Sequence, residues 1–187
     1  MSTKREFLTW PNLFTLIRLF CIPLFIWVLF GQGDRLVAAW LLGALGSTDW
    51  FDGWLARHLD QSSRFGAVFD PTVDRLLFFV AVPSLIIDGS VPILVATLAL
   101  IREVGVALNA IVSYLWRSKI ISVTNAGKTG AFLLMFAFPM FLGSESEASY
   151  AGFLGGLAWV FAVPGLLAGF YSLFFEYLSD LVKPKGE

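Results

Sequence analysis

Four aspartates in two short stretches of the chain have the spacing of a metal-binding site. Asp49 and Asp52 are three residues apart, and Asp70 and Asp74 are four residues apart. Residues at these separations share one face of a helix, so each pair points in one direction if its stretch is helical. Clustered carboxylates repel one another, and hard divalent cations with oxygen ligands relieve that repulsion. The spacing predicts two bound cations, Mg²⁺ or alternatively Mn²⁺, in the arrangement that suits phosphoryl transfer.

The residues between the aspartates support a site for a large phosphorylated ligand. Gly53, Ala56 and Gly66 remove side-chain bulk beside the carboxylates, so a ligand can approach the backbone. Arg57 offers a forked donor that matches phosphate oxygens. The structural alternative is a set of helix-capping and ion-pairing residues, which explains one aspartate at a helix end better than four.

The elements that carry these residues are predicted to be membrane-spanning helices. The chain is 57% hydrophobic and 14% charged, and its mean hydropathy is +0.76, which is typical of a polytopic membrane protein. We expect an all-α integral membrane bundle of about six transmembrane helices, forming a single domain over residues 1–187. The predicted spans are 12–30, 36–57, 66–87, 92–116, 129–142 and 150–177, with a start nearer 123 as the alternative for the fifth and a break at Pro164 as one for the sixth.

The distribution of lysine and arginine predicts the orientation of the bundle. With the N-terminus in the cytoplasm, most of the cations outside the spans fall on the cytoplasmic side. The opposite side then carries Arg35 with Asp34, Asp88, Glu145 and Glu147. Both termini and the active site are therefore expected to face the cytoplasm. The net charge of −1 provides no basic field, so no nucleic-acid partner is expected.

The aspartate segment resembles the signature of the CDP-alcohol phosphotransferase family. The signature, D-x2-D-G-x2-A-R-x8-G-x3-D-x3-D, is matched at every fixed position, namely Asp49, Asp52, Gly53, Ala56, Arg57, Gly66, Asp70 and Asp74. The resemblance implies an enzyme that displaces CMP from a CDP-linked lipid with a second alcohol, and a homodimer in a cell membrane, here a bacterial plasma membrane.

The resemblance also implies a role for each residue. Asp49 and Asp70 would bridge the two metal ions, while Asp52 would bind one ion and Asp74 the other. Asp74 would in addition be the general base that takes the proton of the acceptor hydroxyl. The residues implied for the CDP-diacylglycerol site are Asn12, Thr15, Gly53, Arg57, Ser63 and Gly66.

Within the family, the chain looks most like the phosphatidylglycerophosphate synthases. The cues are residues 11–18, 48–53 and 61–67, followed by Arg102-Glu103 and Gly127-Lys128. This subgroup implies glycerol 3-phosphate as the acceptor, with Lys128 and then Arg102 as partners of its phosphate. A structural salt bridge to Glu103 is the alternative role for Arg102.

Two other functions stay open at this point. The family pattern usually has a second lysine after Gly-Lys, whereas Thr129 follows Lys128 here. Losing that cation favours a less charged acceptor, and the alternative is a cardiolipin synthase of the same family that uses phosphatidylglycerol. Inositol phosphate and serine, which other family members use as acceptors, rank lower. A cation transporter is the alternative from another class. It is disfavoured because the carboxylates lie toward one face and no repeat is visible.

Overall fold

The structure, a computed structural model, describes residues 10–59, 66–117 and 124–182, and this part of the chain is helical throughout apart from short connections. Its elements are α2 (Trp10–Ile26), the π-helical turn η1 (Trp27–Gln32), α3 (Arg35–Leu59), α4 (Gly66–Asp88), α5 (Ile93–Arg117), α6 (Asn125–Ser144) and α7 (Ala151–Val182). The described residues contain no strand. The predicted all-α fold is confirmed.

The predicted spans agree with the helices to within a few residues, except at the fifth and sixth. Helix α6 begins at Asn125 rather than at Thr129, because the hydroxyl of Thr124 accepts a hydrogen bond from the backbone N–H of Gly127 and caps the helix. This start agrees with the alternative nearer residue 123. Helix α7 continues through Pro164 without a break and extends to Val182.

Three of the described helical segments are long and apolar enough to cross a membrane. They are Thr15–Gln32, Asn125–Ser144 and Ala151–Phe175. Helices α4 and α5 carry ionisable residues inside their apolar sequence, among them Asp74, Arg102 and Glu103. Such residues at membrane depth need a polar cavity or a partner, and they mark the candidate functional site.

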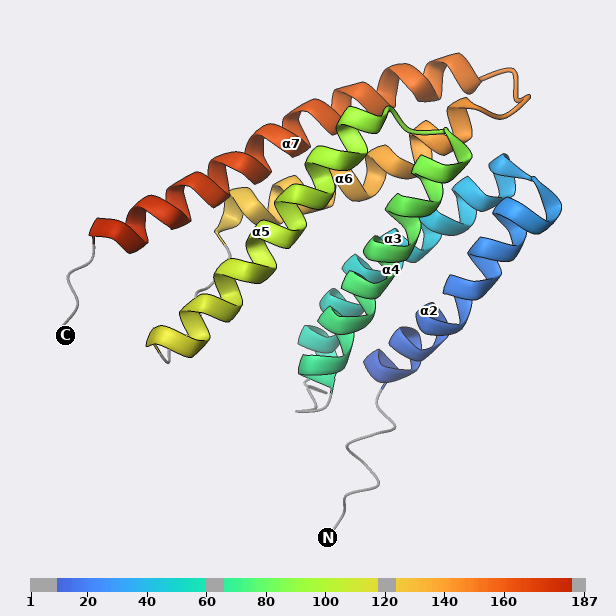
Figure 1. The fold of residues 1–187 in the computed structure, drawn as a ribbon. Helices are drawn as coiled ribbons and strands as arrows, with labels where there is room; N and C mark the ends of the chain where they lie inside the picture. The colour runs from blue at the N-terminus through green and yellow to red at the C-terminus, as the bar shows by residue number, and fades with distance from the viewer. Residues whose placement is uncertain (1–9, 60–65, 118–123, 183–187) are drawn as a thin grey trace, which may run out of the picture.

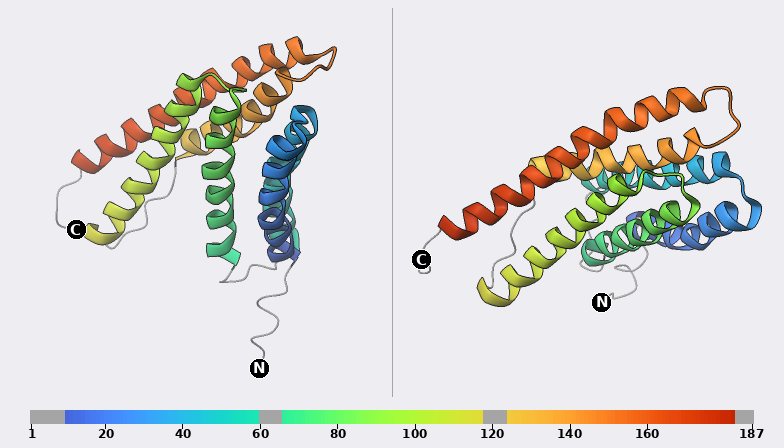
Figure 2. Two further views of the ribbon diagram at one scale, coloured as in Figure 1. Left: turned by 45° about the vertical axis from the view of Figure 1, so that its right-hand side comes forward. Right: turned by 45° about the horizontal axis from the view of Figure 1, so that its top comes forward.

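Consecutive helices run in opposite directions, so their ends gather at two ends of the bundle (Figures 1 and 2). One end, called the aspartate end here, contains the end of α3 at Leu59 and the start of α4 at Gly66. The far end contains the start of α3 at Arg35 and the end of α4 at Asp88. Both predicted aspartate pairs therefore belong to helix segments at the same end.

Helices α6 and α7 form the closest pair in the bundle, and glycines permit their approach. A Cβ atom added at Gly130 of α6 would lie 2.8 Å from the backbone oxygen of Gly165 and 2.7 Å from the backbone nitrogen of Gly169. The backbones touch because none of these residues has a side chain. The spacing of Gly165 and Gly169 thus serves packing within the bundle.

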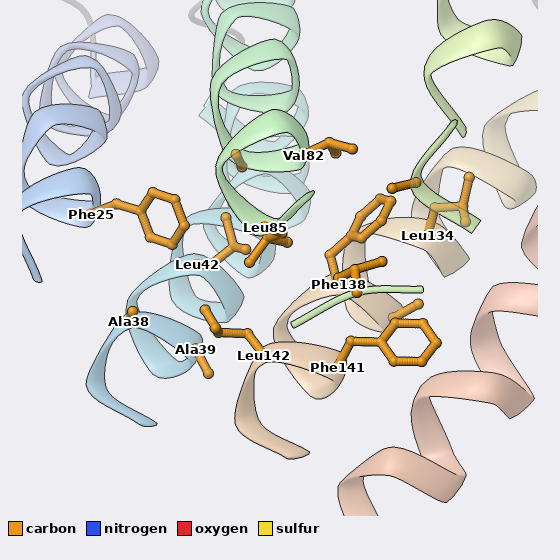
Figure 3. Packing of buried hydrophobic residues seen from close by; sticks show 14 of the residues in the cluster. Phe25, Ala38, Ala39, Leu42, Val82, Leu85, Leu134, Phe138, Phe141 and Leu142 are labelled. Carbon is orange, nitrogen blue, oxygen red and sulfur yellow. The ribbon is translucent and has the colours of Figure 1, made fainter. Parts of the chain in front are cut away.

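The hydrophobic core contains residues from each of the helices α2 to α7, and Figure 3 shows the part where α2, α3, α4 and α6 meet. Phe25 of α2 and Leu85 of α4 are fully buried, and Leu42 of α3 packs in the same cluster. Helix α6 adds Phe138 and Leu142. A contiguous core of this kind fixes the relative positions of the four helices.

Polar contacts tie the helices together at the far end. The guanidinium of Arg35 donates through Nε to Asp88 Oδ2 at 3.1 Å and through Nη1 to the backbone oxygen of Glu145 at 3.5 Å. The contacts join α3 to the ends of α4 and α6. Arg35, Asp88 and Glu145, which the charge pattern assigned to one side, do lie at one end of the bundle.

Candidate active site

Asp74 lies on α4 about two helical turns from the aspartate end. Its side chain is 30% exposed and lines a cavity of about 380 Å³. The carboxylate forms an ion pair with the guanidinium of Arg18 on α2. The proposed base is therefore held in place and still reachable from the cavity.

Arg18 connects three helices at this point. Its side chain is 2% exposed, and besides Asp74 it reaches the hydroxyl of Thr48 on α3, with 3.5 Å between Nη2 and Oγ1. Thr48 directly precedes Asp49, the first signature aspartate. A single side chain therefore links Asp74 to the segment of α3 where the other aspartate pair begins.

The cavity is lined by four charged residues and a larger number of small or apolar ones. Its charged residues are Asp74 and Arg75 from α4, Glu103 from α5 and Lys128 from α6. The remaining lining residues are small or apolar: Leu42, Gly46, Leu77, Phe78, Ala81, Val82, Ala131, Phe132, Met135 and Phe138. Two of the four charged groups are cationic and two anionic. The cavity thus offers charged groups of both signs together with an apolar surface.

Aromatic and methionine side chains shape the apolar part of the cavity. The rings of Phe78 and Phe138 meet edge to face with their centroids 5.9 Å apart. Met135 covers Gly46, where an added Cβ would lie 2.9 Å from the Met135 Cγ atom. Because Phe138 also belongs to the core, the floor of the cavity is part of the packed interior.

Lys128 is positioned by a network at the start of α6. The capping residue Thr124 also bonds Ser172 of α7, with 2.6 Å between the two hydroxyl oxygens. The backbone oxygen of Gly127 accepts a hydrogen bond of 2.7 Å from Nη2 of the buried Arg102. These contacts fix the first turn of α6, and Lys128 extends from that turn as an exposed residue that lines the cavity.

Comparison with known proteins decides which family carries this arrangement. The sequence profile of the family described as CDP-alcohol phosphatidyltransferase matches residues 8–164, a stretch that contains the whole aspartate signature. The chain belongs to the CDP-alcohol phosphatidyltransferase family. This membership confirms the resemblance and shows that the protein is a membrane transferase of phospholipid biosynthesis.

Three bacterial relatives illustrate the range of names in the family. The chain is 34% identical over 169 residues to a putative cardiolipin synthase of Mycobacterium tuberculosis strain H37Rv, covering 89% of this chain and 79% of the relative. It is 33% identical over 141 residues to a probable phosphatidylglycerophosphate synthase of the same strain, covering 69% and 68%. A cardiolipin synthase (CMP-forming) of Streptomyces coelicolor is 34% identical over 163 residues, covering 83% and 74%. Both acceptor alternatives from the sequence therefore occur among the relatives' names.

The structure describes the side chains of some of the phosphatidyltransferase's predicted site residues but not of others. Asp74 and Lys128 line the same cavity, and Thr15 is buried on α2. Seven others lie in described helices, but their side chains are outside the described part: Asn12, Asp49, Asp52, Gly53, Arg57, Gly66 and Asp70. Ser63 falls in the segment 60–65, outside the described residues.

Arg102 lies outside the cavity lining, next to the cavity residue Glu103. Its side chain is 5% exposed, does not line the cavity, and donates through Nη1 to Glu103 Oε2 at 2.7 Å. The structural salt bridge considered from the sequence is therefore present. Binding of an acceptor by Arg102 stays a prediction. Glu103, which the sequence indicated only as a partner of Arg102, lines the cavity.

Among the described side chains, no three metal-ligating groups come together. The donor chemistry nevertheless fits a divalent cation, because the signature offers carboxylates alone and these are the ligands that Mg²⁺ prefers. Asp74 faces the cavity, and its contact Arg18 also reaches Thr48, the neighbour of Asp49. The family to which the chain belongs is generally dependent on divalent cations.

Proposed function

We propose that this phosphatidyltransferase moves the phosphatidyl group of CDP-diacylglycerol to the primary hydroxyl of an acceptor alcohol, releasing CMP. The observation that carries the proposal is the shared cavity of Asp74 and Lys128 in a chain with the complete family signature. Glycerol 3-phosphate is the first candidate acceptor. Its hydroxyl would lie at Asp74, and its phosphate would be bound by Lys128, with Arg75 as the second cation of the cavity.

The protein's residues divide the reaction between them. The acceptor oxygen attacks the lipid-side phosphorus of CDP-diacylglycerol, a new P–O bond forms, and the pyrophosphate P–O bond to CMP breaks. Asp74 takes the proton of the attacking hydroxyl as general base. Arg18 orients the Asp74 carboxylate through their ion pair. Arg57 and Gly53 would bind the CDP-lipid, by analogy with the family.

Two divalent cations, Mg²⁺ or Mn²⁺, would be held by Asp49, Asp52, Asp70 and Asp74. When bound, they neutralise the pyrophosphate and stabilise the departing CMP. Chelation of divalent cations is therefore expected to stop CMP release, and added Mg²⁺ is expected to restore it. An undiminished rate in excess chelator would contradict the metal requirement.

Phosphatidylglycerol is the second candidate acceptor, and a specific observation favours it. Most of the cavity lining is apolar, from Leu42 on α3 to Phe132 and Phe138 on α6. An acyl chain fits such a lining better than a doubly charged small molecule does. Two of the three relatives described above are also named cardiolipin synthases.

One experiment tests the proposal and separates the acceptors. Purified enzyme in detergent or liposomes receives labelled CDP-diacylglycerol with glycerol 3-phosphate, phosphatidylglycerol, inositol phosphate or serine in parallel reactions. CMP release and the labelled lipid product are measured. Product with glycerol 3-phosphate supports the first candidate, and product with phosphatidylglycerol alone supports the second. If none of the four acceptors leads to CMP release, phosphatidyl transfer to these alcohols is contradicted.

The site is proposed to face the cytoplasm of a bacterial plasma membrane. The lysine and arginine distribution supports this orientation. The bacterial origin of the relatives supports the choice of membrane. The aspartate end then lies at the depth of the lipid phosphates, where CDP-diacylglycerol presents its nucleotide to the cytosol. A homodimer is the expected assembly.

A further inference from the structure

Glu103 is a carboxylate inside the bundle that the proposed mechanism does not use. It lies on α5, its side chain is 15% exposed, and it lines the same cavity as Asp74 and Lys128. An ionisable group within an apolar helix is costly unless a polar partner or a ligand stabilises it. The surroundings of its two oxygens therefore show what it can bind.

The two carboxylate oxygens of Glu103 have different surroundings. Oε2 accepts a hydrogen bond of 2.7 Å from Nη1 of Arg102. Oε1 lies 4.0 Å from Nε of Arg75, which is too far for a hydrogen bond. One oxygen is thus committed to a buried guanidinium, and the other retains capacity to accept a hydrogen bond on the side of Arg75 and the cavity.

Arg102 holds the Glu103 carboxylate in a fixed position. Its second terminal nitrogen bonds the backbone oxygen of Gly127 at 2.7 Å, so the guanidinium is anchored to α6. Its stem packs on α7, where a Cβ added at Gly169 would lie 3.0 Å from Nε. A guanidinium confined by two helices presents Glu103 as a preorganised acceptor, which is what a specificity contact requires.

We infer that Glu103 is a specificity-determining residue that recognises the secondary hydroxyl next to the attacking hydroxyl of a glycerol headgroup. The inference rests on the proposed function. With the attacking hydroxyl at Asp74, the adjacent hydroxyl enters the same cavity, and Oε1 accepts its hydrogen bond. Both candidate acceptors carry this vicinal diol, so the role of Glu103 is the same for either one. A carboxylate accepts hydrogen bonds and donates none, which matches a hydroxyl and repels a phosphate.

The test uses acceptors with and without that hydroxyl. Glycerol 3-phosphate is compared with 3-hydroxypropyl phosphate, and phosphatidylglycerol with phosphatidyl-1,3-propanediol. The ratio of kcat/KM for CMP release is measured for the pair that the enzyme accepts. We expect the wild-type enzyme to prefer the glycerol acceptor by about 10–100-fold, the range for a hydrogen bond to a charged group.

Glu103→Ala should reduce this preference to about onefold, because only the glycerol acceptor loses a contact. Glu103→Gln keeps an acceptor oxygen but no charge, so its ratio should be intermediate. Glu147→Ala removes an exposed carboxylate from the connection between α6 and α7, and it should leave the wild-type ratio unchanged.

Several results would overturn the inference. An equal loss for both acceptors in Glu103→Ala would show a purely structural role. A wild-type enzyme with equal kcat/KM for the two acceptors would also contradict the inference. That measurement does not depend on whether any variant folds. CMP release with neither acceptor would overturn the proposed function and this inference together, whereas release with an unchanged ratio in the variants overturns only the role of Glu103.

Discussion

At the scale of single residues, Asp74 combines two properties that a general base needs. Its carboxylate is oriented by the buried Arg18, and part of it remains open to the cavity. An oriented base contributes to the rate only if the reacting hydroxyl can reach it. Arg18 restricts the side-chain motion of Asp74 without closing that access.

Replacing Asp74 with Asn tests this role directly. Asp74→Asn keeps the shape of the side chain but removes the proton acceptor, so kcat should fall by about 100-fold or more. CMP release from CDP-diacylglycerol measures the loss, and thermal unfolding in detergent checks that the helices remain folded. Near-normal turnover would remove Asp74 from the role of base.

Asp88→Asn is the matched control for that substitution. Asp88 lies on the same helix at the far end, where it pairs with Arg35 in a partly buried contact. Asp88 is not among the residues that line the cavity, so activity should stay within about twofold of wild type. A similar loss in both variants would indicate a general effect of altering α4.

Lys128 is proposed to bind the phosphate of glycerol 3-phosphate, and a substitution tests this contact. A lysine bound to a phosphate contributes a charge-assisted hydrogen bond, so Lys128→Gln should raise KM for glycerol 3-phosphate by about 10-fold or more. Steady-state kinetics at saturating CDP-diacylglycerol measures this. Asn125→Gln, an exposed change one turn earlier in α6 and outside the cavity lining, should leave KM unchanged.

The sequence indicated which residues are candidates for the site but not which residues contact them. The fixed spacing of the signature made Asp74 a candidate, Gly127-Lys128 made Lys128 one, and both line the cavity. Arg18 is 56 positions from Asp74, and helical periodicity carries no information about contacts at that separation. The access of Glu103 to the cavity was missed because its neighbour Arg102 offered a sufficient local explanation for a charge inside an apolar helix.

At the scale of elements, the start of α6 both packs against α7 and carries the cavity residue Lys128. Gly130 touches the backbone of α7 at Gly165 and Gly169, and Lys128 is two residues before it. Arg102 packs on Gly169 and bonds Gly127. The close approach of α6 and α7 therefore sets the position of the guanidinium and of the first turn that carries Lys128.

A methyl group at Gly130 should disturb this contact. Gly130→Ala places a Cβ less than 3 Å from the α7 backbone, and overpacking of this kind costs about 1–3 kcal/mol. The thermal midpoint in detergent should fall by about 2–10 °C. Gly156→Ala on α7 is the matched control, because an added Cβ there meets nothing within 4 Å. Equal midpoints for the two variants would contradict the tight contact.

Hydrophobicity predicted the positions of the helices, but it did not predict where α6 begins or that α7 continues through Pro164. The start of α6 was predicted late because the polar residues Asn125 and Lys128 lowered local hydropathy, whereas the Thr124 cap decides where the helix begins. Pro164 does not break α7, because the surrounding residues continue the apolar helix on both sides of it. Hydropathy locates the spans, and caps and packing set their ends.

At the scale of the whole molecule, charge and chemistry separate along the bundle. Asp74 and Lys128 belong to the half toward the aspartate end, while Arg35, Asp88 and Glu145 are joined at the far end. The core of Figure 3 includes Leu42 and Phe138, which also line the cavity. The two groups of charged residues thus lie in opposite halves of the bundle.

Cysteine labelling tests which surface that is. Cys21, the single native cysteine, is replaced by Ala, and one new cysteine is introduced as Ser146→Cys near the far end or as Asn125→Cys at the start of α6. If the lysine-rich side is cytoplasmic, a membrane-impermeant maleimide should label Ser146→Cys in intact spheroplasts. Asn125→Cys should react only after the membrane is permeabilised.

The two cysteine positions control for each other, since both are hydrophilic and lie at helix boundaries. The reverse labelling pattern would place the aspartate end outside the cell. CMP and glycerol 3-phosphate are cytosolic molecules, so that result would contradict both the orientation and the proposed reaction. Labelling as expected would put the base, the cation Lys128 and the CDP-lipid headgroup in one compartment, which the transfer of a phosphatidyl group to a water-soluble acceptor requires.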